Sequence, residues 1–221
     1  MRIEYTIRDP ILIDGNAGFL GDNSSTGIGQ GSGTITDPYV IEGWKIDASS
    51  QHGIQIRNAD VYFIIRDCYV YDGIVTWRSG IYLYNCTNGH LSNNTCLNNE
   101  HGIQVYRYST KNTLIDNNCS NNRYGIDVSS SSDITLINNT CSSNNWDGII
   151  LYETTDSTLV DNICTENYRG ISIVLSSGNT LINNNCSNNR NGIDVSSSSD
   201  ITLINNTCNS SNWDGIRLAE V

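Results

Sequence analysis

The sequence predicts an all-β parallel solenoid, because a unit of about 22 residues repeats along most of the 221-residue chain. A Gly-Ile step opens each unit, and successive steps lie 22 or 23 residues apart after a first interval of 27. A cysteine follows most steps by 16 or 17 residues, with asparagines two residues before it and three after it. The glycines of the steps are Gly53, Gly80, Gly102, Gly125, Gly148, Gly170, Gly192 and Gly215.

Each unit consists of short extended segments separated by polar corners. In the Gly-Ile segment, alternation places Ile126 and Val128 inward and Asp127 and Ser129 outward. Coils stacked about 4.8 Å apart would place like side chains over one another, which suits asparagine because its amide donates to one neighbour and accepts from the other. A leucine-rich repeat has a similar period, but its L-x-x-L-x-L frame is absent from this sequence.

The regular cysteines are predicted to form a buried column of free thiols. In-register residues of adjacent parallel strands are separated by the strand spacing, which exceeds the Cβ separation of about 3.8 Å that a disulfide prefers. Cys86 stands outside this pattern and is predicted to be partly exposed. The predicted column is Cys68, Cys96, Cys119, Cys141, Cys164, Cys186 and Cys208.

The two ends of the chain differ from the repeats. Residues 1–50 are predicted to form an N-terminal capping segment and entry coil, and residues 51–221 one continuous domain of coils. The last coil stops directly after its Gly-Ile strand with no evident C-terminal cap, so we expect either a fragment of a longer chain or an end that stacks on another copy to build filaments. The first residues lack the apolar core of a signal peptide.

Charge and hydropathy exclude several classes of partner. The formal net charge of −11 disfavours nucleic acid and anionic membrane surfaces, which both require clustered lysine and arginine. No run of 18 or more apolar residues is present, so no membrane insertion is predicted for this segment.

Two repeated units carry a family resemblance. Leu-Ile-x-Asn-x-Cys-x-x-Asn and Gly-Ile-x-Val recur from Gly53 to Leu218, preceded by Gly31–Thr34 and Asp37–Trp44. With these units the chain resembles the right-handed parallel β-helix proteins, specifically the NosD-like and pectate-lyase-like repeat families of archaeal and bacterial surface proteins. The resemblance implies a single-stranded right-handed β-helix at the cell surface or outside the cell. It implies the fold more strongly than an activity, because lyases, hydrolases, epimerases, adhesins and stalks share this fold.

The outward face of the Gly-Ile strands carries the candidate binding residues. Aromatic rings stack on the apolar faces of sugars while polar groups fix the hydroxyls, although long exposed strands also recruit tyrosine through β-propensity alone. The leading interpretation is a non-catalytic surface module, part stalk and part polysaccharide-binding surface. The candidate ligand-binding residues are Tyr82, Tyr84, Tyr106, Trp146, Tyr152, Tyr168 and Trp213.

A polysaccharide lyase, hydrolase or epimerase is the alternative from the enzyme class. Related lyases gather acids on neighbouring coils to hold calcium, whereas Asp127 here lies between Gln104 and Ile150, so calcium is possible but unsupported. Residues 117–149 recur almost unchanged at 184–216, and therefore the weak catalytic candidates come in two copies. They are Asp127, Asp147 and Arg123 in the first copy, and Asp194, Asp214 and Arg190 in the second.

No metal site is predicted. Copper is the metal that the NosD resemblance implies, but one methionine, three histidines and inward thiols offer no evident site for it. His52 and His101 each precede a Gly-Ile step and are expected to be ordinary corner residues. The Asn-x-Ser/Thr sequences at Asn93, Asn138 and Asn205 are candidate glycosylation sites that are expected to point outward.

Overall fold

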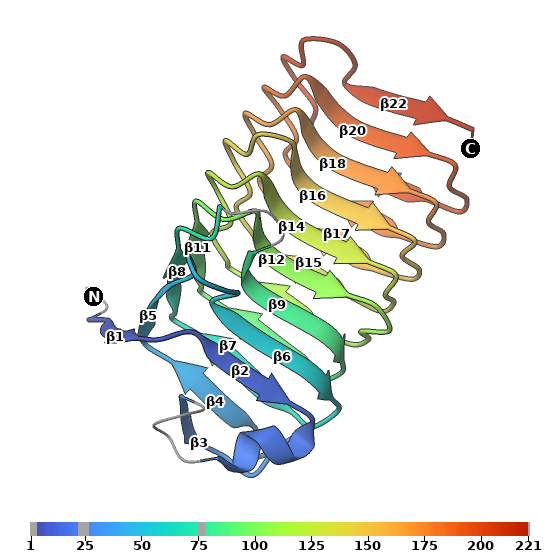
Figure 1. Ribbon diagram of the computed structural model, residues 1–221. Helices are drawn as coiled ribbons and strands as arrows, with labels where there is room; N and C mark the ends of the chain where they lie inside the picture. The colour runs from blue at the N-terminus through green and yellow to red at the C-terminus, as the bar shows by residue number, and fades with distance from the viewer. Residues whose placement is uncertain (1–3, 22–26, 75–77, 221) are drawn as a thin grey trace.

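The computed structural model describes residues 4–21, 27–74 and 78–220 and shows a parallel β-solenoid (Figure 1). Its strands form three sheets that run along the solenoid, and equivalent residues of adjacent coils are 22 or 23 residues apart over most of its length. All eight Gly-Ile steps lie at or inside the start of a strand of one nine-stranded sheet. The prediction of an all-β parallel solenoid is therefore confirmed.

The nine-stranded sheet that contains the Gly-Ile steps is called the Gly-Ile sheet. In spatial order its strands are β2 (Ile11–Asp14), β6 (Ile54–Ala59), β9 (Ser79–Cys86), β12 (His101–Tyr106), β14 (Tyr124–Ser129), β16 (Asp147–Tyr152), β18 (Arg169–Val174), β20 (Asn191–Ser196) and β22 (Ile216–Ala219). All of its strand pairs are parallel.

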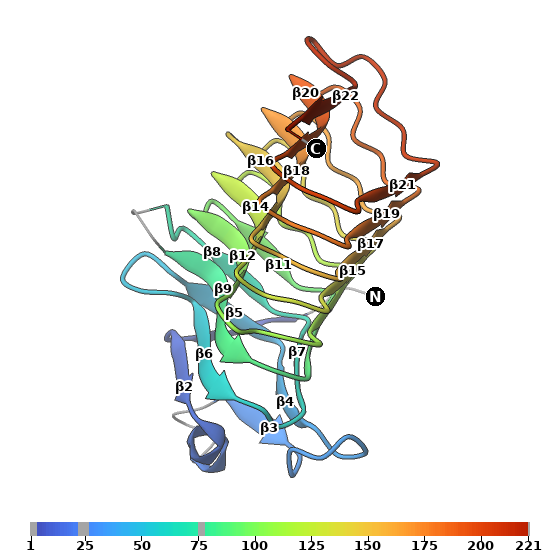
Figure 2. The ribbon, with the colours of Figure 1, turned by 90° about the vertical axis from the view of Figure 1, so that its right-hand side faces the viewer.

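The other two sheets line the remaining sides of the solenoid (Figure 2). The Thr-Leu sheet orders β3 (Ile28–Gln30), β4 (Tyr39–Glu42), β7 (Phe63–Arg66), β10 (Gly89–Ser92), β13 (Thr113–Ile115), β15 (Thr135–Ile137), β17 (Thr158–Val160), β19 (Thr180–Ile182) and β21 (Thr202–Ile204). The four-stranded sheet orders β1 (Thr6–Arg8), β5 (Trp44–Asp47), β8 (Tyr69–Tyr71) and β11 (Thr95–Leu97).

The N-terminal region contributes the first coil of the solenoid and also covers the end of its apolar core. β2, β4 and β5 belong to the three sheets, so these strands already contribute a coil. A 3-10 helix, η1 (Asn16–Leu20), carries Phe19, which stacks on Tyr39 with ring centroids 4.8 Å apart and is 2% exposed. Phe63 lies on the other side at 5.6 Å, and these rings seal the apolar core at this end. Among the described residues, no helix is long and apolar enough to cross a membrane.

Two asparagine columns stabilise the corners of the coils. In the first column Asn139 donates from Nδ2 to Asn162 Oδ1 at 3.0 Å and to the Leu114 carbonyl at 2.9 Å, and its own Oδ1 accepts from Asn117. Each buried amide therefore forms hydrogen bonds with the coils on both sides of it. The two columns are Asn94, Asn117, Asn139, Asn162, Asn184 and Asn206, and Asn99, Asn122, Asn144, Asn167 and Asn189.

A further corner column adopts positive φ. Its members lie directly before the first asparagine column, and all are Asn or Asp, the non-glycine residues that best tolerate the left-handed region. They are Asp67, Asn93, Asp116, Asn138, Asp161, Asn183 and Asn205, with φ between 52° and 56°.

The thiols are free, and the structure changes the membership of their column. The eight cysteines form no disulfide, and all but Cys208 are buried. Cys96 lies beside Val70 in the four-stranded sheet, whereas the Cys68 amide donates to Asn94 Oδ1 at 3.1 Å. Cys68 therefore heads the asparagine column, and the prediction that it belongs to the thiol column is wrong.

Cys86 also differs from expectation. It is 0% exposed, because it pairs with Ala59 in the preceding strand β6 and its amide donates to Ser109 Oγ at 3.1 Å on the other side. It belongs to a second inward column of small side chains, so its predicted exposure is wrong. Burial raises the pKa of Cys68 to about 12 and that of Cys86 to about 11, which keeps both thiols neutral.

We expect native protein to expose at most one thiol to a thiol-specific reagent. Cys208 is half-buried and the other seven cysteines are buried, so only Cys208 should react before unfolding. Ellman's reagent should count all eight thiols in guanidinium chloride. Rapid reaction of several thiols in native conditions would contradict the buried column.

We expect Asn139→Ala to destabilise the protein by about 2–4 kcal/mol, because it leaves buried partners on two coils without hydrogen bonds. Asn138→Gly is the matched control, since Asn138 is exposed with φ 54° and glycine accepts that conformation. Urea unfolding of both variants measures the difference. Equal effects of the two substitutions would show that the column contributes little.

Candidate functional site

The outer face of the Gly-Ile sheet contains a hollow of about 290 Å³ over β12, β14 and β16. Alternate residues of each strand point outward, and parallel register brings outward residues of adjacent coils together. Thus Gln104 lies beside Asp127, and Asp127 beside Ile150. The hollow is lined by Glu100, His101, Arg123, Tyr124, Asp127, Ser129, Ile150 and Tyr152.

A histidine–aspartate pair forms the buried wall of this hollow. His101 Nε2 lies 3.3 Å from Asp127 Oδ2, and the two residues are only 5% and 8% exposed. Asp127 also accepts hydrogen bonds from Gln104 Nε2 at 2.9 Å and from Ser129 Oγ at 2.5 Å. An amide and a hydroxyl therefore hold the Asp127 carboxylate beside the imidazole of His101.

The surroundings keep this imidazole neutral. Burial lowers the pKa of His101, and the charges of Asp127 and Glu100 only partly oppose that shift. Its ring stacks on Tyr124 at 5.2 Å, and burial raises the pKa of that tyrosine. At neutral pH the site therefore presents a neutral imidazole and a protonated phenol.

A charged pair lies at the edge of the hollow. Arg123 Nη1 donates to Glu100 Oε1 at 2.9 Å, with side-chain exposures of 43% and 8%. The arginine predicted to act with Asp127 therefore pairs with Glu100 instead, and Asp147 pairs with Arg169. The structure does not bring the trio of Asp127, Asp147 and Arg123 into mutual contact through any ion pair among the described residues.

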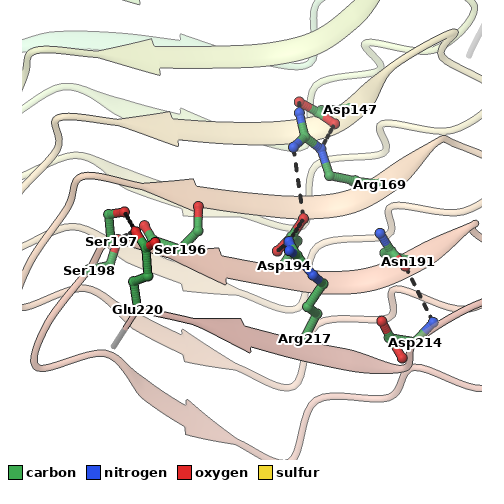
Figure 3. A network of polar contacts seen from close by, with 10 residues as sticks. All are labelled: Asp147, Arg169, Asn191, Asp194, Ser196, Ser197, Ser198, Asp214, Arg217 and Glu220. Atoms are coloured by element: carbon green, nitrogen blue, oxygen red, sulfur yellow. Dashed lines mark hydrogen bonds and ion pairs between the residues drawn. The ribbon is translucent and has the colours of Figure 1, made fainter.

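The second copy of the acid has a different environment (Figure 3). Arg169 pairs with Asp147 through bonds of 2.6 and 2.9 Å and lies 3.8 Å from Asp194, which also accepts from Arg217 at 3.0 Å. Arg217 and Arg169 thus occupy the places of Ile150 and His101 around the first copy. Asp194 is clamped by two cations, whereas Asp127 contacts a neutral imidazole beside an open hollow.

The other members of the second predicted trio lie apart from Asp194. The Asp214 amide donates to Asn191 Oδ1 at 3.3 Å. Arg190 stacks on Trp213, with its guanidinium 3.2 Å from the ring centroid, and on Tyr168 at 4.8 Å. Arg190 is therefore part of an aromatic row.

The seven predicted ligand-binding rings fall into two groups and one single residue. Tyr82, Tyr84 and Tyr106 form a cluster with centroids 6.0–6.4 Å apart on β9 and β12. Trp146, Tyr168 and Trp213 form a row with centroids 5.4 and 6.5 Å apart; the first two lie directly before β16 and β18, and Trp213 lies three residues before β22. The remaining ring, Tyr152, lines the hollow and is 37% exposed.

Sequence reasoning missed His101, Glu100 and Tyr124 as site residues. His101 was expected at a corner, but it is the first residue of β12, and the parallel register brings its side chain to Asp127. Its position three residues before Gln104, the register partner of Asp127, was the available indication. His52 does lie at a corner, where its Nδ1 accepts from the Ser79 amide at 2.9 Å and its ring stacks on Tyr82.

The remaining candidates are surface residues. Asn93, Asn138 and Asn205 are exposed at the positive-φ corner, which is compatible with glycosylation, and their modification stays a prediction. Within residues 4–21, 27–74 and 78–220, no group of three or more His, Cys, Asp or Glu side chains is arranged to hold a metal ion.

The half-buried His52 predicts sensitivity to acid. Burial lowers the pKa of His52 to about 4, below its ordinary value of 6.5, so the unfolded chain takes up a proton that the native chain does not. This stability is present above pH 6.5 and is lost as the pH falls toward 4. We expect His52→Gln to reduce the loss between pH 7 and pH 5 by about 1 kcal/mol, a value discounted for its half-buried position. Urea unfolding at both pH values tests this, and an unchanged pH dependence would contradict it.

Comparison with solved structures shows the parallel β-helix fold. The periplasmic alginate epimerase AlgG aligns with a TM-score of 0.69 and 22% identity over 76% of this chain and 44% of that one. Tailspike protein 2 of bacteriophage CBA120 aligns with a TM-score of 0.73 and 15% identity over 98% of this chain and 36% of that one. The A-module of mannuronan C-5 epimerase AlgE6 from Azotobacter vinelandii aligns with a TM-score of 0.65 and 15% identity over 96% of this chain and 70% of that one. The chain thus spans less than half of AlgG.

Sequence comparison identifies the family. A search of curated protein sequences finds no match to this chain. The family model described as periplasmic copper-binding protein (NosD) matches residues 13–221, which include the hollow and all strands except β1 and the start of β2. The chain belongs to the NosD family.

Proposed function

We propose that this chain acts outside the cytoplasm as a polysaccharide-binding module, with the outer face of the Gly-Ile sheet as its binding surface. The observation that carries the proposal is the hollow of about 290 Å³, which is walled by buried polar groups and by two tyrosines. A hollow of this size with few polar groups and rings suits a sugar unit, because rings pack on its carbon faces while polar groups orient its hydroxyls.

The two aromatic groups extend the surface on both sides of the hollow. The cluster of Tyr82, Tyr84 and Tyr106 lies toward the N-terminal coils, and the row from Trp146 to Trp213 lies toward the C-terminal coils. Trp146 and Trp213 are 41% and 60% exposed, which is unusual for such large apolar side chains. A polymer that follows the solenoid axis would contact both groups and the hollow together.

The charge distribution also favours this face as the surface that binds an acidic polysaccharide. The Gly-Ile strands and the residues directly beside their ends contain seven of the 12 basic residues and eight of the 23 acidic residues. The face is therefore close to neutral, while the rest of the chain carries most of the negative charge. The basic residues are Arg57, Arg78, Arg107, Arg123, Arg169, Arg190 and Arg217, and the acidic ones Asp14, Asp60, Glu100, Asp127, Asp147, Glu153, Asp194 and Glu220.

The solved structures of similar fold support the proposal that the ligand is a polysaccharide. They are an alginate epimerase, a mannuronan epimerase and the enzymatically active domain of a phage tailspike. Alginate and mannuronan are polysaccharides, so at least these two epimerases use the fold to act on a polysaccharide. Periplasmic location in the family description and in AlgG supports a place outside the cytoplasm.

The copper in the family description does not fit the described residues. Seven of the eight thiols are buried, His52 Nδ1 accepts from the Ser79 amide, and His101 Nε2 lies 3.3 Å from Asp127 Oδ2. The one methionine, Met1, lies outside the described residues. Copper sites gather exposed imidazole, thiolate or thioether ligands around one point, and the described residues provide no such group. We therefore assign no step of the proposed function to copper.

We expect Tyr152→Ala to weaken polysaccharide binding about five- to tenfold, because loss of a stacked ring costs about 1–1.4 kcal/mol. Tyr71→Ala is the matched control, since Tyr71 is a half-buried ring on the four-stranded sheet. Titration calorimetry with alginate, polygalacturonate and dextran measures the affinities. No binding to any of them, or equal losses in both variants, would contradict the proposal.

A further inference from the structure

We propose that the outer face of the Thr-Leu sheet binds ice through the five coils from β13 to β21. The outward residues of these five strands are called the Thr-Ile face. This function is separate from the polysaccharide binding proposed above, because it uses another sheet and another class of ligand. Four features carry it: two uniform columns, hydroxyl groups without protein partners, side chains that are neither charged nor aromatic, and acidic corners on both sides.

The Thr-Ile face repeats the same two side chains on every coil. Each of its strands reads Thr-Leu-Ile or Thr-Leu-Val, and the leucine points inward. Parallel register therefore forms one outward column of threonines and one of isoleucines, with Val160 in place of one isoleucine. Figure 2 shows β15, β17, β19 and β21 in line along the solenoid. The threonines are Thr113, Thr135, Thr158, Thr180 and Thr202.

Register alone does not make an outward column uniform. In β7 the same two columns contain Ile64 and Arg66. In the Gly-Ile sheet one outward column changes at each step from β12 to β20. That column contains Gln104, Asp127, Ile150, Ser172 and Asp194. The repetition on the Thr-Ile face therefore exceeds what the fold requires.

The threonine hydroxyl groups of the Thr-Ile face remain available to a ligand. Within residues 4–21, 27–74 and 78–220, none of the five makes a hydrogen bond to the protein. A buried hydroxyl of this chain behaves differently, since Thr154 Oγ1 donates to the Val128 carbonyl at 3.0 Å. Threonine has few side-chain rotamers, so these hydroxyl and methyl groups form an ordered array before any ligand binds.

The spacing of the array selects a periodic ligand. Adjacent coils lie about 4.8 Å apart, and the two outward residues of one strand lie about 6.6 Å apart. A ligand contacts all five coils alike only if it repeats at these distances. Hexagonal ice repeats its oxygen atoms at similar distances on its prism faces. Each water of that lattice donates and accepts hydrogen bonds, as a threonine hydroxyl does.

The chemistry of the Thr-Ile face favours ice over other periodic ligands. None of its outward residues is charged, although the chain has a net charge of −11, so the face offers nothing to an ionic crystal or a charged polymer. None is aromatic, and rings are the groups that pack on the carbon faces of sugars. Methyl and hydroxyl groups alone remain, and these match a neutral hydrogen-bonded lattice.

Acidic corners disfavour a second copy of the chain as the ligand. Asp133, Asp156 and Asp200 lie two residues before threonines of the face, and Asp116 and Asp161 lie directly after its second column. All five are exposed. Two copies packed face to face would bring these carboxylates together, which costs free energy through repulsion and desolvation. Beside a neutral crystal the same carboxylates stay hydrated.

Uptake into growing ice tests the proposal. Ice is grown slowly into a dilute solution of the full chain, and the protein in the ice and in the liquid is measured. We expect the wild-type protein to be enriched in the ice. Val160→Lys should lower this partition at least about tenfold, which corresponds to about 1.4 kcal/mol of lost binding. Arg66 occupies the same column in β7, so the fold accepts a long basic side chain there.

Val174→Lys is the matched control. Val174 is likewise a half-buried outward valine, on the neighbouring strand β18, but it belongs to the Gly-Ile sheet. We expect this variant to partition into ice as the wild-type protein does. Melting curves of both variants establish that they are folded. Inhibition of ice recrystallisation, followed by microscopy, should be lost in Val160→Lys and kept in Val174→Lys.

The other outcomes assign the face to a different ligand or to none. Exclusion of the wild-type protein from ice, or an equal loss in both lysine variants, overturns the proposal. Light scattering across concentration tests for a second copy, and a dimer that Val160→Lys abolishes would overturn ice as the ligand. Binding to microcrystalline cellulose that Val160→Lys abolishes, without uptake into ice, would assign the face to a sugar crystal instead.

Discussion

The in-register pairing of parallel strands is the constraint on which the rest of this structure depends. Each coil presents its side chains directly over those of the coil before it, so a residue that suits one coil must also suit its two neighbours. Asparagine meets this demand at the corners because it both donates and accepts along the axis. Glycine meets it at the Gly-Ile step, where a Cβ on Gly102 would lie 2.7 Å from the Gly125 carbonyl oxygen.

The same constraint gives the outer face its chemistry. Every outward residue belongs to a neighbourhood of three coils, so its environment changes when any one of them changes. Asp127 and Asp194 stand in nearly identical sequence, yet one contacts a neutral imidazole and the other two guanidinium groups. Duplication copied the residues, and the flanking coils gave the two copies different electrostatics.

The sequence allowed the fold to be predicted almost completely, since periodicity determines register in a solenoid. The Leu91 to Leu114 pairing and both asparagine columns follow from spacing alone. Errors arose where the coil length changes. Between Val70 and Cys96 the interval is 26 residues, and Cys68, which follows Gly53 by 15 residues, was therefore assigned to the wrong column.

The site was less predictable for a different reason. Spacing placed Asp127 on the outer face. In the structure Asp127 is only 8% exposed, because long side chains from adjacent coils cover it. Whether Arg123 turns toward Asp127 or Glu100 depends on side-chain geometry that no repeat pattern contains. Likewise, His101 became a site residue only once the start of β12 was known.

The positive-φ corner has an electrostatic consequence. Stacked carboxylates about 4.8 Å apart would repel one another strongly, yet no two acids are adjacent in this column, because Asp67, Asp116 and Asp161 alternate with asparagines. The intervening amide also donates to its neighbour, as Asn93 does to Asp67 at 2.5 Å. Like charges are thereby held about 10 Å apart, which is about one Debye length in physiological salt. An acidic chain of this fold can therefore lengthen coil by coil without accumulating repulsion along its edge.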